Sequence, residues 1–400
     1  MGEKTSGRAL DIRRKPPPPK KPFSCPDIGG KLHLLLVVCL LFRTALHLEN
    51  GAHSTSRCLI LPEILGITRL MPLTDTPLVS VIMPCFNDAA FIGEAIQSIL
   101  AQDYRNREII VVDDGSTDNS IDVIRSFGSD VILLTQENAG SAIARNFALQ
   151  QASGELIAFL DSDDAWLPGK LRTQVNFLKT NPGIGACFTA FHHWWPDGDG
   201  LYPDVASFPL PEKEGPKKNA TIEWCYPDLL LKFPFWTGTA LIPRTVIEKA
   251  GPFNPELRVG QDYDLWIRIA TKYKIAFLDL KTALYRKNPT SNTKWFHKKN
   301  YRALIVENAL ERFGKTGADG KTINEEALAL KLSSLWQSYA RGAIQAGERG
   351  IAVMALDKAI SYRKNAKLFA VNMGCRIPVI FRLFHAYLKH KIGALPVRNY

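Results

Sequence analysis

After residue 77, short runs that are apolar throughout alternate with segments whose apolar residues recur at helical spacing. Four short runs are apolar throughout and predict buried strands at Val79–Met83, Ile109–Val112, Val131–Leu134 and Leu156–Leu160. Between the runs, apolar residues recur at helical spacing in three groups: residues 91–100, residues 121–127 with Gly128 as a stop signal, and residues 141–152. Alternating apolar strands and helices predict an α/β fold, with a mainly parallel sheet covered by helices on both faces.

The remainder of the chain is less regular. Residues 196–227 are rich in Pro, Gly and Lys, which predicts a long loop. A strand is expected at Thr239–Ile242 and an amphipathic helix at Asp262–Lys272. From about residue 295 the pattern is helical, and short connections join Glu325–Ala346 to Gly350–Tyr362. We therefore predict an α/β domain at residues 77–290 and a helical region at residues 295–400.

Residues 1–70 show no sustained period and include a basic, Pro-rich stretch, which predicts disorder. Their most apolar run, Leu32–Phe42, would span about 16 Å as a helix, against a hydrocarbon core of roughly 30 Å. A signal anchor at this run is the alternative interpretation. Since Met71 lies eight residues before Val79, we expect residues 1–70 to be a dispensable extension or a misread start.

The charge and the cysteines narrow the class of protein. Of the net charge of +11, residues 1–70 contribute +6 (eleven Lys and Arg against five Asp and Glu), which leaves +5 for the other 330 residues. This weak surplus gives no reason to expect a nucleic-acid partner. The seven cysteines are scattered without metal-ligand spacing, so no zinc site is predicted. Scattered single cysteines are typical of a reducing, cytoplasmic environment.

Two acidic loops follow directly on predicted strands. The second strand runs into residues 113–118, DDGSTD, and the fourth into residues 161–164, DSDD. Carboxylates about 4 Å apart repel by on the order of 1 kcal/mol in water, and more where water is excluded. A hard divalent cation such as Mg²⁺ or Mn²⁺ would remove this penalty and could bridge a diphosphate leaving group. The alternative is that these residues only make turns and cap helices.

Taken together, several motifs resemble family-2 glycosyltransferases with the GT-A fold. They are VSVIMPCFN at residues 79–87, the run at 111–118, NAG at 138–140 with ARN at 144–146, FLDSDD at 159–164 and GQDYDLW at 260–266. The resemblance covers residues 78–290. It implies an inverting, metal-dependent transfer of a sugar from a nucleotide diphosphate, with uridine as the expected base.

The resemblance also implies roles for single residues around the donor. Pro84, Phe86 and Asn87 would shape the pocket for the base and ribose, and Asp114 would accept a hydrogen bond from the base. Arg145 would position the second acidic loop or the diphosphate. Arg286 and Asn288, after the last predicted strand, are further candidates to contact the phosphates.

The same resemblance implies the metal ligands and the base. Asp161 and Asp163 would form the Asp-x-Asp pair, with Asp163 as the direct ligand of Mg²⁺ or Mn²⁺. Asp262 would be the general base, although it could instead be only a helix cap. Gln261 stands where the family usually has Glu. The acceptor is expected to be a glycan or a lipid-linked hydroxyl in cell-envelope polysaccharide synthesis. A catalytically inactive nucleotide-sugar-binding protein and a nucleotidyltransferase are the alternatives.

Residues 376–392 predict a basic amphipathic helix. Ile380, Leu383, Phe384 and Leu388 would share one face, with four Lys and Arg side chains around it. Such a helix can lie on the anionic, cytoplasmic face of a membrane, whereas packing against the rest of the protein is the alternative.

Overall fold

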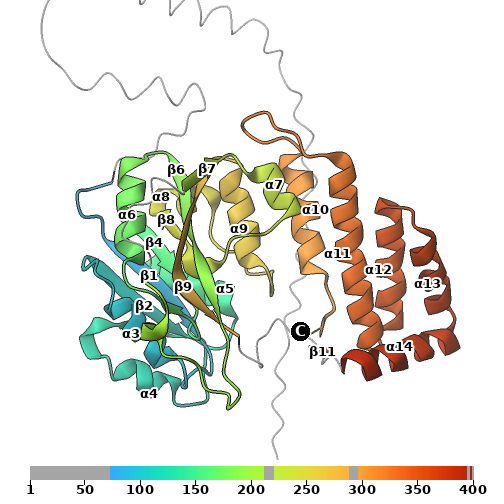
Figure 1. Cartoon of the computed structure of the whole chain (residues 1–400), viewed down its shortest axis with the longest axis horizontal. Helices are drawn as coiled ribbons and strands as arrows, with labels where there is room; N and C mark the ends of the chain where they lie inside the picture. The colour runs from blue at the N-terminus through green and yellow to red at the C-terminus, as the bar shows by residue number, and fades with distance from the viewer. Residues whose placement is uncertain (1–72, 211–219, 288–295, 394–396, 399–400) are drawn as a thin grey trace, which may run out of the picture. The chain divides into compact units, whose positions relative to one another are not determined.

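The computed structural model describes residues 73–210, 220–287, 296–393 and 397–398. The expectations for residues 1–70, including the anchor at Leu32–Phe42, lie outside the described residues. Within them, a central sheet of nine strands has helices on both faces, and further helices follow toward the C-terminus (Figure 1). The strand order along the sheet is β3-β2-β1-β4-β8-β6-β9-β5, with β7 also paired to β9.

The strands predicted at the start of the domain all form, and they pair in parallel. β1 (Val79–Cys85) lies between β2 (Arg107–Asp113) and β4 (Leu156–Phe159), and β3 (Ile132–Thr135) pairs with the outer side of β2. β1 is buried along its whole length, because both faces of the sheet are covered. β3 is partly exposed, since it lies at the edge of the sheet.

The second half of the sheet is mixed, so the sheet is parallel only in part. β6 (Ile184–Trp194) and β9 (Lys274–Arg286) are parallel to each other, but β8 (Leu241–Pro243) is antiparallel to both β4 and β6. β5 (Ala165–Trp166) and β7 (Ala220–Glu223) pair antiparallel with β9. The loop predicted at residues 196–227 is therefore interrupted by β7 at residue 220 and by the start of a helix at Tyr226.

Helices pack on both faces of the sheet because successive strand residues point to opposite sides. One apolar core joins Ile82, Val112 and Phe159 to α5 (Ser141–Gln151) and α9 (Gln261–Ala270). The other joins the alternate residues of these strands to α3 (Ile92–Leu100), α4 (Ser120–Arg125) and α6 (Lys170–Thr180). The other α-helices of the described part of this domain are α7 (Tyr226–Leu231) and α8 (Arg244–Ala250).

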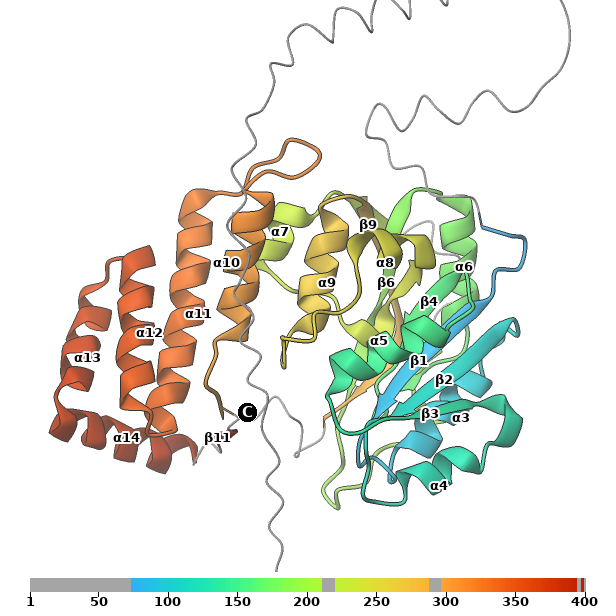
Figure 2. The ribbon, with the colours of Figure 1, turned by 180° about the vertical axis from the view of Figure 1, so that it is seen from behind.

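The predicted helical region forms after β10 (Phe296–His297), which pairs with β11 (Val397–Arg398). Its five helices are α10 (Tyr301–Phe313), α11 (Glu325–Gln345), α12 (Arg349–Tyr362), α13 (Ala366–Arg376) and α14 (Pro378–Ile392). α10 packs against α9 and α11 against α7, so the region is joined to the α/β domain (Figure 2). Trp336 and Tyr362 both donate hydrogen bonds to the Glu307 carboxylate, at 2.9 and 2.7 Å, which fixes the helices to one another.

No single helix among the described residues is both long and apolar enough to cross a bilayer. α13 and residues 378–391 of α14 reach that length and composition only as a pair, and they are bent by 111° at the break between them.

Candidate active site

The two acidic loops lie at the same edge of the sheet. β2 ends at Asp113 and β4 at Phe159, and both strands flank β1 in parallel. Their carboxyl ends therefore open on one side, where ligands bind in open α/β sheets. The ends of β6 and β9 lie there too, because β8 is antiparallel to both β4 and β6, so β6 runs in the direction of β4, and β9 is parallel to β6.

The loop after β1 is held against the first acidic loop. Asn87 adopts a positive φ of 54°, and its side-chain oxygen accepts a hydrogen bond from the Thr117 N–H at 2.7 Å. Asn87 in turn donates its N–H to the Ser116 hydroxyl at 2.9 Å. Pro84 is buried opposite Val112, whereas Phe86 is 42% exposed. The exposed ring of Phe86 is therefore accessible to a ligand, and the roles of Pro84, Phe86 and Asn87 around the donor base stay predictions.

Asp114 fixes the loop that begins α5. Its carboxylate accepts the N–H groups of Ala139 and Gly140, both at 2.8 Å, and the Gln136 amide at 2.7 Å. Gly140 has a φ of 95°, which favours glycine. A carboxylate has about four acceptor positions, so Asp114 keeps room for one further donor. Its predicted contact with a base stays a prediction.

Arg145 and Asp161 form an ion pair at 2.5 Å. The Arg145 side chain is 8% exposed and that of Asp161 is 31% exposed, so one partner is buried and the other faces solvent. The Arg145 guanidinium also lies 5.5 Å from the centre of the Phe253 ring. Arg145 therefore ties the Asp161 loop to α5 and leaves part of the Asp161 carboxylate accessible.

Carboxylates crowd the second acidic loop. Burial, together with the negative charges of Asp161 and Asp88, raises the pKa of Asp163 to about 7. Burial likewise raises the pKa of Asp88, whose carboxylate accepts the Ser162 hydroxyl. The Asp164 side chain accepts the Arg286 N–H at 2.7 Å through one oxygen, and its other oxygen is buried without a hydrogen bond.

Arg286 holds the second acidic loop from its buried side, a role different from the predicted contact with the donor phosphates. Its side chain is 2% exposed; it donates to the Asp163 carbonyl at 2.6 Å and forms an ion pair with Glu94. The guanidinium stacks within 3.6 to 4.5 Å of three ring centres, those of Trp194, Tyr202 and Phe91. Asn288 lies outside the described residues.

Replacing Arg286 by Lys tests this support. A lysine keeps the charge but cannot bond the Asp163 carbonyl and Glu94 while stacking on three rings. We expect the free energy of unfolding, measured by urea titration, to fall by about 1–3 kcal/mol. The exposed Lys281 on the same strand is the control, as Lys281→Gln. An unchanged urea midpoint in Arg286→Lys would show that the contacts of the Arg286 guanidinium do not hold the second acidic loop.

Asp262 lies in the first turn of α9, not at its cap. Gly260, with φ 79°, is the capping residue, and the Asp262 carboxylate accepts the Thr237 hydroxyl at 2.8 Å. Burial raises the pKa of Asp262, while Thr237 and the charge of Arg145 lower it. The neighbouring Asp264 is instead bound to Arg268 at 2.9 Å. Asp264 is thus held in a structural ion pair, which leaves Asp262 as the carboxylate facing the site.

Gln261, which replaces the Glu usual at this position, joins two helices. Its amide donates to the Ser141 hydroxyl at 2.8 Å, at the first residue of α5. The side chain is neutral and well packed, with 8% of the residue exposed. It therefore keeps Asp262 next to the loop that Asp114 holds.

Tyr285 shows that the predicted residues converge. Its pKa is raised by burial and then by the negative charges of Asp164, Asp163, Asp161 and Asp262. The phenol on β9 is thus close enough to the second acidic loop and to Asp262 for both to act on it, although the sequence separates them by about a hundred residues. The convergence places the Asp-x-Asp pair and the candidate base around one space.

Aromatic side chains form one wall of that space, which sequence reasoning missed. We call Phe191, Trp236 and Tyr285 the aromatic wall. The centre of the Trp236 ring lies 5.1 Å from that of Tyr285 and 5.2 Å from that of Phe191. All three are only partly buried. The feature of the sequence that could have indicated this wall is the high density of aromatic residues at 191–195 and 233–236. His193 extends the wall, with its ring 5.3 Å from Phe191.

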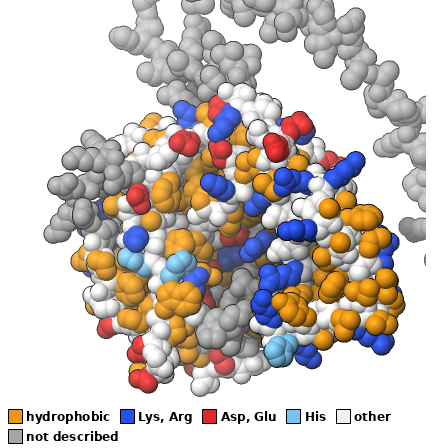
Figure 3. All heavy atoms as spheres, turned by 45° about the vertical axis from the view of Figure 1, so that its right-hand side comes forward, with side chains coloured by type: hydrophobic (Ala, Val, Ile, Leu, Met, Phe, Trp, Pro, Cys, Tyr) orange, Lys and Arg blue, Asp and Glu red, His pale blue; other side chains and the backbone are white. Residues whose placement is uncertain are grey.

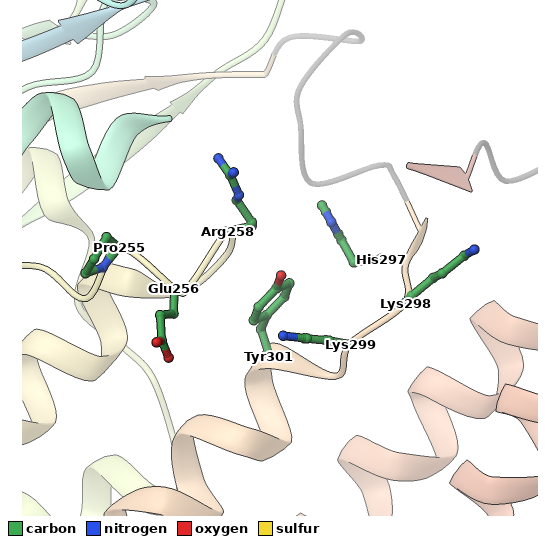
Figure 4. A pocket seen from close by; sticks show the side chains of 7 residues that line it. All are labelled: Pro255, Glu256, Arg258, His297, Lys298, Lys299 and Tyr301. Carbon is green, nitrogen blue, oxygen red and sulfur yellow. The ribbon is translucent and has the colours of Figure 1, made fainter. Parts of the chain in front are cut away.

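A basic cavity of about 480 Å³ lies between the loop before α9 and the start of α10. Arg258, His297 and Tyr301 face it from two sides, and Lys298 and Lys299 lie at its rim (Figure 4). Arg258 also donates to the Ala139 carbonyl at 3.1 Å, in the loop that Asp114 holds. The cavity therefore adjoins the loop that Asp114 holds, and its basic side chains favour an anion.

Comparison with known proteins decides the family. The sequence model of glycosyl transferase family 2 matches residues 80–227. TuaG of Bacillus subtilis, named a putative teichuronic acid biosynthesis glycosyltransferase, is 33% identical over 55% of this chain and 83% of its own. The chain belongs to glycosyltransferase family 2. The family is that of sugar-transferring enzymes, so the nucleotidyltransferase alternative is wrong.

One further relative and one solved structure are similar to this family-2 glycosyltransferase. WfgD of Escherichia coli, named a UDP-Glc:α-D-GlcNAc-diphosphoundecaprenol β-1,3-glucosyltransferase, is 34% identical over 60% of this chain and 90% of its own. The crystal structure of residues 1–349 of S. aureus TarS, in complex with UDP-GlcNAc, has a TM-score of 0.55. It is 18% identical and covers 79% of this chain and 92% of its own. This likeness confirms the predicted GT-A fold.

Proposed function

We propose that this glycosyltransferase moves a sugar from a UDP-sugar to a hydroxyl of a lipid-linked or glycan acceptor, with inversion at the anomeric carbon. The observation that carries the proposal is that the Arg145–Asp161 ion pair lies near Asp262, with Asp163 in the same acidic loop as Asp161 and Tyr285 near all three carboxylates. Such a site can bind a diphosphate at one side and accept a proton from a hydroxyl at the other. The named activity of WfgD supports UDP as the nucleotide and a lipid diphosphate as the acceptor.

The donor diphosphate would lie over the second acidic loop, with a divalent cation. Among the described residues, no three Asp, Glu, His or Cys side chains converge on one metal position. This fits Mg²⁺ or Mn²⁺, which one or two carboxylates and the substrate phosphates commonly hold. Asp163, with Asp161 beside it, would supply the carboxylates. Burial and the negative charges of Asp161 and Asp88 disfavour the ionised form of Asp163, and a bound cation would offset both effects. When bound, the cation stabilises the charge that develops on the leaving diphosphate.

Asp262 would remove the proton from the attacking acceptor hydroxyl. Thr237 orients its carboxylate, and burial keeps water from solvating it. Arg145 bonds Asp161 and lies close enough to affect the pKa of Asp262, so one guanidinium connects the donor loop to the base. One displacement at the anomeric carbon then inverts its configuration.

The aromatic wall and the basic cavity fit the acceptor. Partly exposed rings pack well against the apolar faces of sugars. A basic cavity fits the diphosphate of a lipid-linked acceptor. We place the reaction in cell-envelope polysaccharide synthesis, as the names of TuaG and WfgD indicate for those proteins. The four described cysteines are free and buried, in keeping with a cytoplasmic enzyme.

Trp236→Ala tests the acceptor side. The Trp236 ring lies over Gly238 and contacts Tyr285, so its removal opens the wall without touching a carboxylate. We expect the KM for the acceptor to rise roughly tenfold, or about 1.4 kcal/mol, with the KM for the donor unchanged. Phe233→Ala, in the same loop but against Tyr263, is the matched control. Equal acceptor KM values in the two variants would exclude the wall as the acceptor surface.

A nucleotide-sugar screen tests the proposed donor. The purified protein is heated with UDP-, GDP-, ADP- and dTDP-sugars, each with Mn²⁺ and with EDTA. We expect a saturable rise in the melting temperature with a UDP-sugar only when the cation is present. Stabilisation by another nucleotide, or equal stabilisation in EDTA, would overturn the proposed donor or the metal.

A further inference from the structure

Large apolar side chains are exposed along the last two described helices. Six of them lie between residues 369 and 387, each between 39% and 66% exposed: Phe369, Met373, Ile377, Val379, Leu383 and Tyr387. Single exposed apolar residues are normal on a protein surface, whereas a cluster indicates an interaction site. We call these six residues the apolar patch.

The residues of the apolar patch recur at helical spacing. Phe369, Met373 and Ile377 recur every fourth residue along α13 and its end, and Val379, Leu383 and Tyr387 do so along α14. Residues four apart lie on one face of a helix. Each helix therefore has a continuous apolar stripe, and the two stripes adjoin at the bend between Arg376 and Pro378.

The inward face of α14 is a separate set of residues. Phe384 and Leu388 pack into the core of the helical region together with the buried Phe381. Ile380 is half-buried, and its side chain lies near Gly374 of α13, as that of Phe384 does. The face predicted from sequence, which joined Leu383 to Ile380, Phe384 and Leu388, was therefore wrong, because Leu383 is 64% exposed and points away from them. The protein's own core already accounts for the inward face, so the apolar patch needs another partner.

The charge around the patch is of one sign. Residues 358–400 hold nine Lys and Arg and no Asp or Glu, a net of +9 out of +11 for the whole chain. Arg382, Lys389 and Lys391 on α14 are exposed, as are Lys364 and Lys367 at the start of α13. Figure 3 shows the apolar atoms gathered on the side that carries these helices, with Lys and Arg beside them. Apolar stripes flanked by basic side chains match an anionic lipid surface.

The position of α14 is consistent with such a surface. In Figures 1 and 2, α14 lies at the same end of the molecule as the carboxyl ends of β6 and β9. The aromatic wall lies at that end, since Phe191 and Tyr285 are among the last four residues of β6 and β9. A membrane in contact with α14 would therefore lie on the side on which the site opens.

We infer that the exposed face of α13 and α14, formed by the apolar patch and its basic border, docks the enzyme peripherally on an anionic bilayer. Val379, Leu383 and Tyr387 enter the headgroup region, while Arg382, Lys389 and Lys391 bind lipid phosphates. The docking does not depend on which donor or acceptor the enzyme uses.

Flotation of the full chain with vesicles tests the inference. The vesicles are phosphatidylcholine alone, or phosphatidylcholine mixed with phosphatidylglycerol. We expect binding to the mixed vesicles at low salt, weaker binding at high salt, and little binding to phosphatidylcholine alone. A triple variant, Val379→Ser with Leu383→Ser and Tyr387→Ser, is expected to lose about tenfold or more of its partitioning.

Matched controls separate the patch from other surfaces. Leu330→Ser with Met354→Ser removes exposed apolar residues of α11 and α12 and should bind vesicles like the unmodified chain. The far-ultraviolet circular dichroism and melting temperature of each variant show whether it folds. For a folded triple variant, binding equal to that of the control overturns the inference and assigns the contact elsewhere, as does a lack of binding by the unmodified chain. If sedimentation instead shows that the triple variant turns a dimer into a monomer, the patch is an interface between copies, and the inference fails.

Discussion

Asp262→Asn is expected to lower turnover by about 10²–10⁴-fold while leaving the affinity for the donor nearly unchanged. Asparagine has the same shape and keeps a hydrogen-bonding partner for Thr237, so the first turn of α9 should persist. What it loses is the ability to accept the proton of the acceptor hydroxyl. Steady-state kinetics, with donor binding measured by titration calorimetry, separate the two effects.

Asp264→Asn is the control for this experiment. Asp264 belongs to the same helical turn but is paired to Arg268, which also donates to the carbonyls of residues 250–252. Its replacement should lower stability and leave the turnover number nearly intact. If donor affinity collapsed in Asp262→Asn while turnover held, Asp262 would be a binding residue and not the base.

Asp163→Ala is expected to reduce turnover to background and to remove the cation dependence of UDP binding. Burial, and after it the negative charges of Asp161 and Asp88, raise the pKa of Asp163 to about 7, so a cation at this carboxylate would offset both effects. Calorimetric titration of UDP with Mn²⁺ and with EDTA measures the effect.

Asp122→Ala serves as the matched control for Asp163→Ala. Its side chain is 79% exposed on α4 and forms only a surface ion pair with Arg125. We expect wild-type turnover and wild-type cation dependence. Full activity of Asp163→Ala, or full activity of the unmodified enzyme in excess EDTA, would show that the acidic loop holds no catalytic cation.

The parallel half of the sheet and both acidic loops were predictable because their signals are local. Three of the four apolar runs, those of β1, β2 and β4, lie in strands covered on both faces, and each Asp cluster follows its strand directly, so neither signal depends on distant residues. The mixed half was not predictable in the same way. β8 has three residues and β5 has two, and both depend on partners that lie far away in the sequence.

The same difference between local signals and contacts of distant residues applies to the functional residues. The motif carboxylates could be assigned from sequence, whereas the role of Arg286 depends on rings from residues 91, 194 and 202, which no spacing connects. The aromatic wall likewise joins β6, β9 and the loop at residue 236. On α14 the helical period was correct, but only packing against α11 and α13 determines which apolar side chains turn inward.

The configuration of the product tests the central claim most directly. The purified enzyme is given the α-linked UDP-sugar selected by the donor screen, Mn²⁺ and a lipid-diphosphate sugar acceptor, and the new glycosidic bond is examined by proton NMR. A single displacement assisted by Asp262 predicts a β-linked product, with the large anomeric coupling of a gluco-configured sugar. An α-linked product would contradict the proposed mechanism.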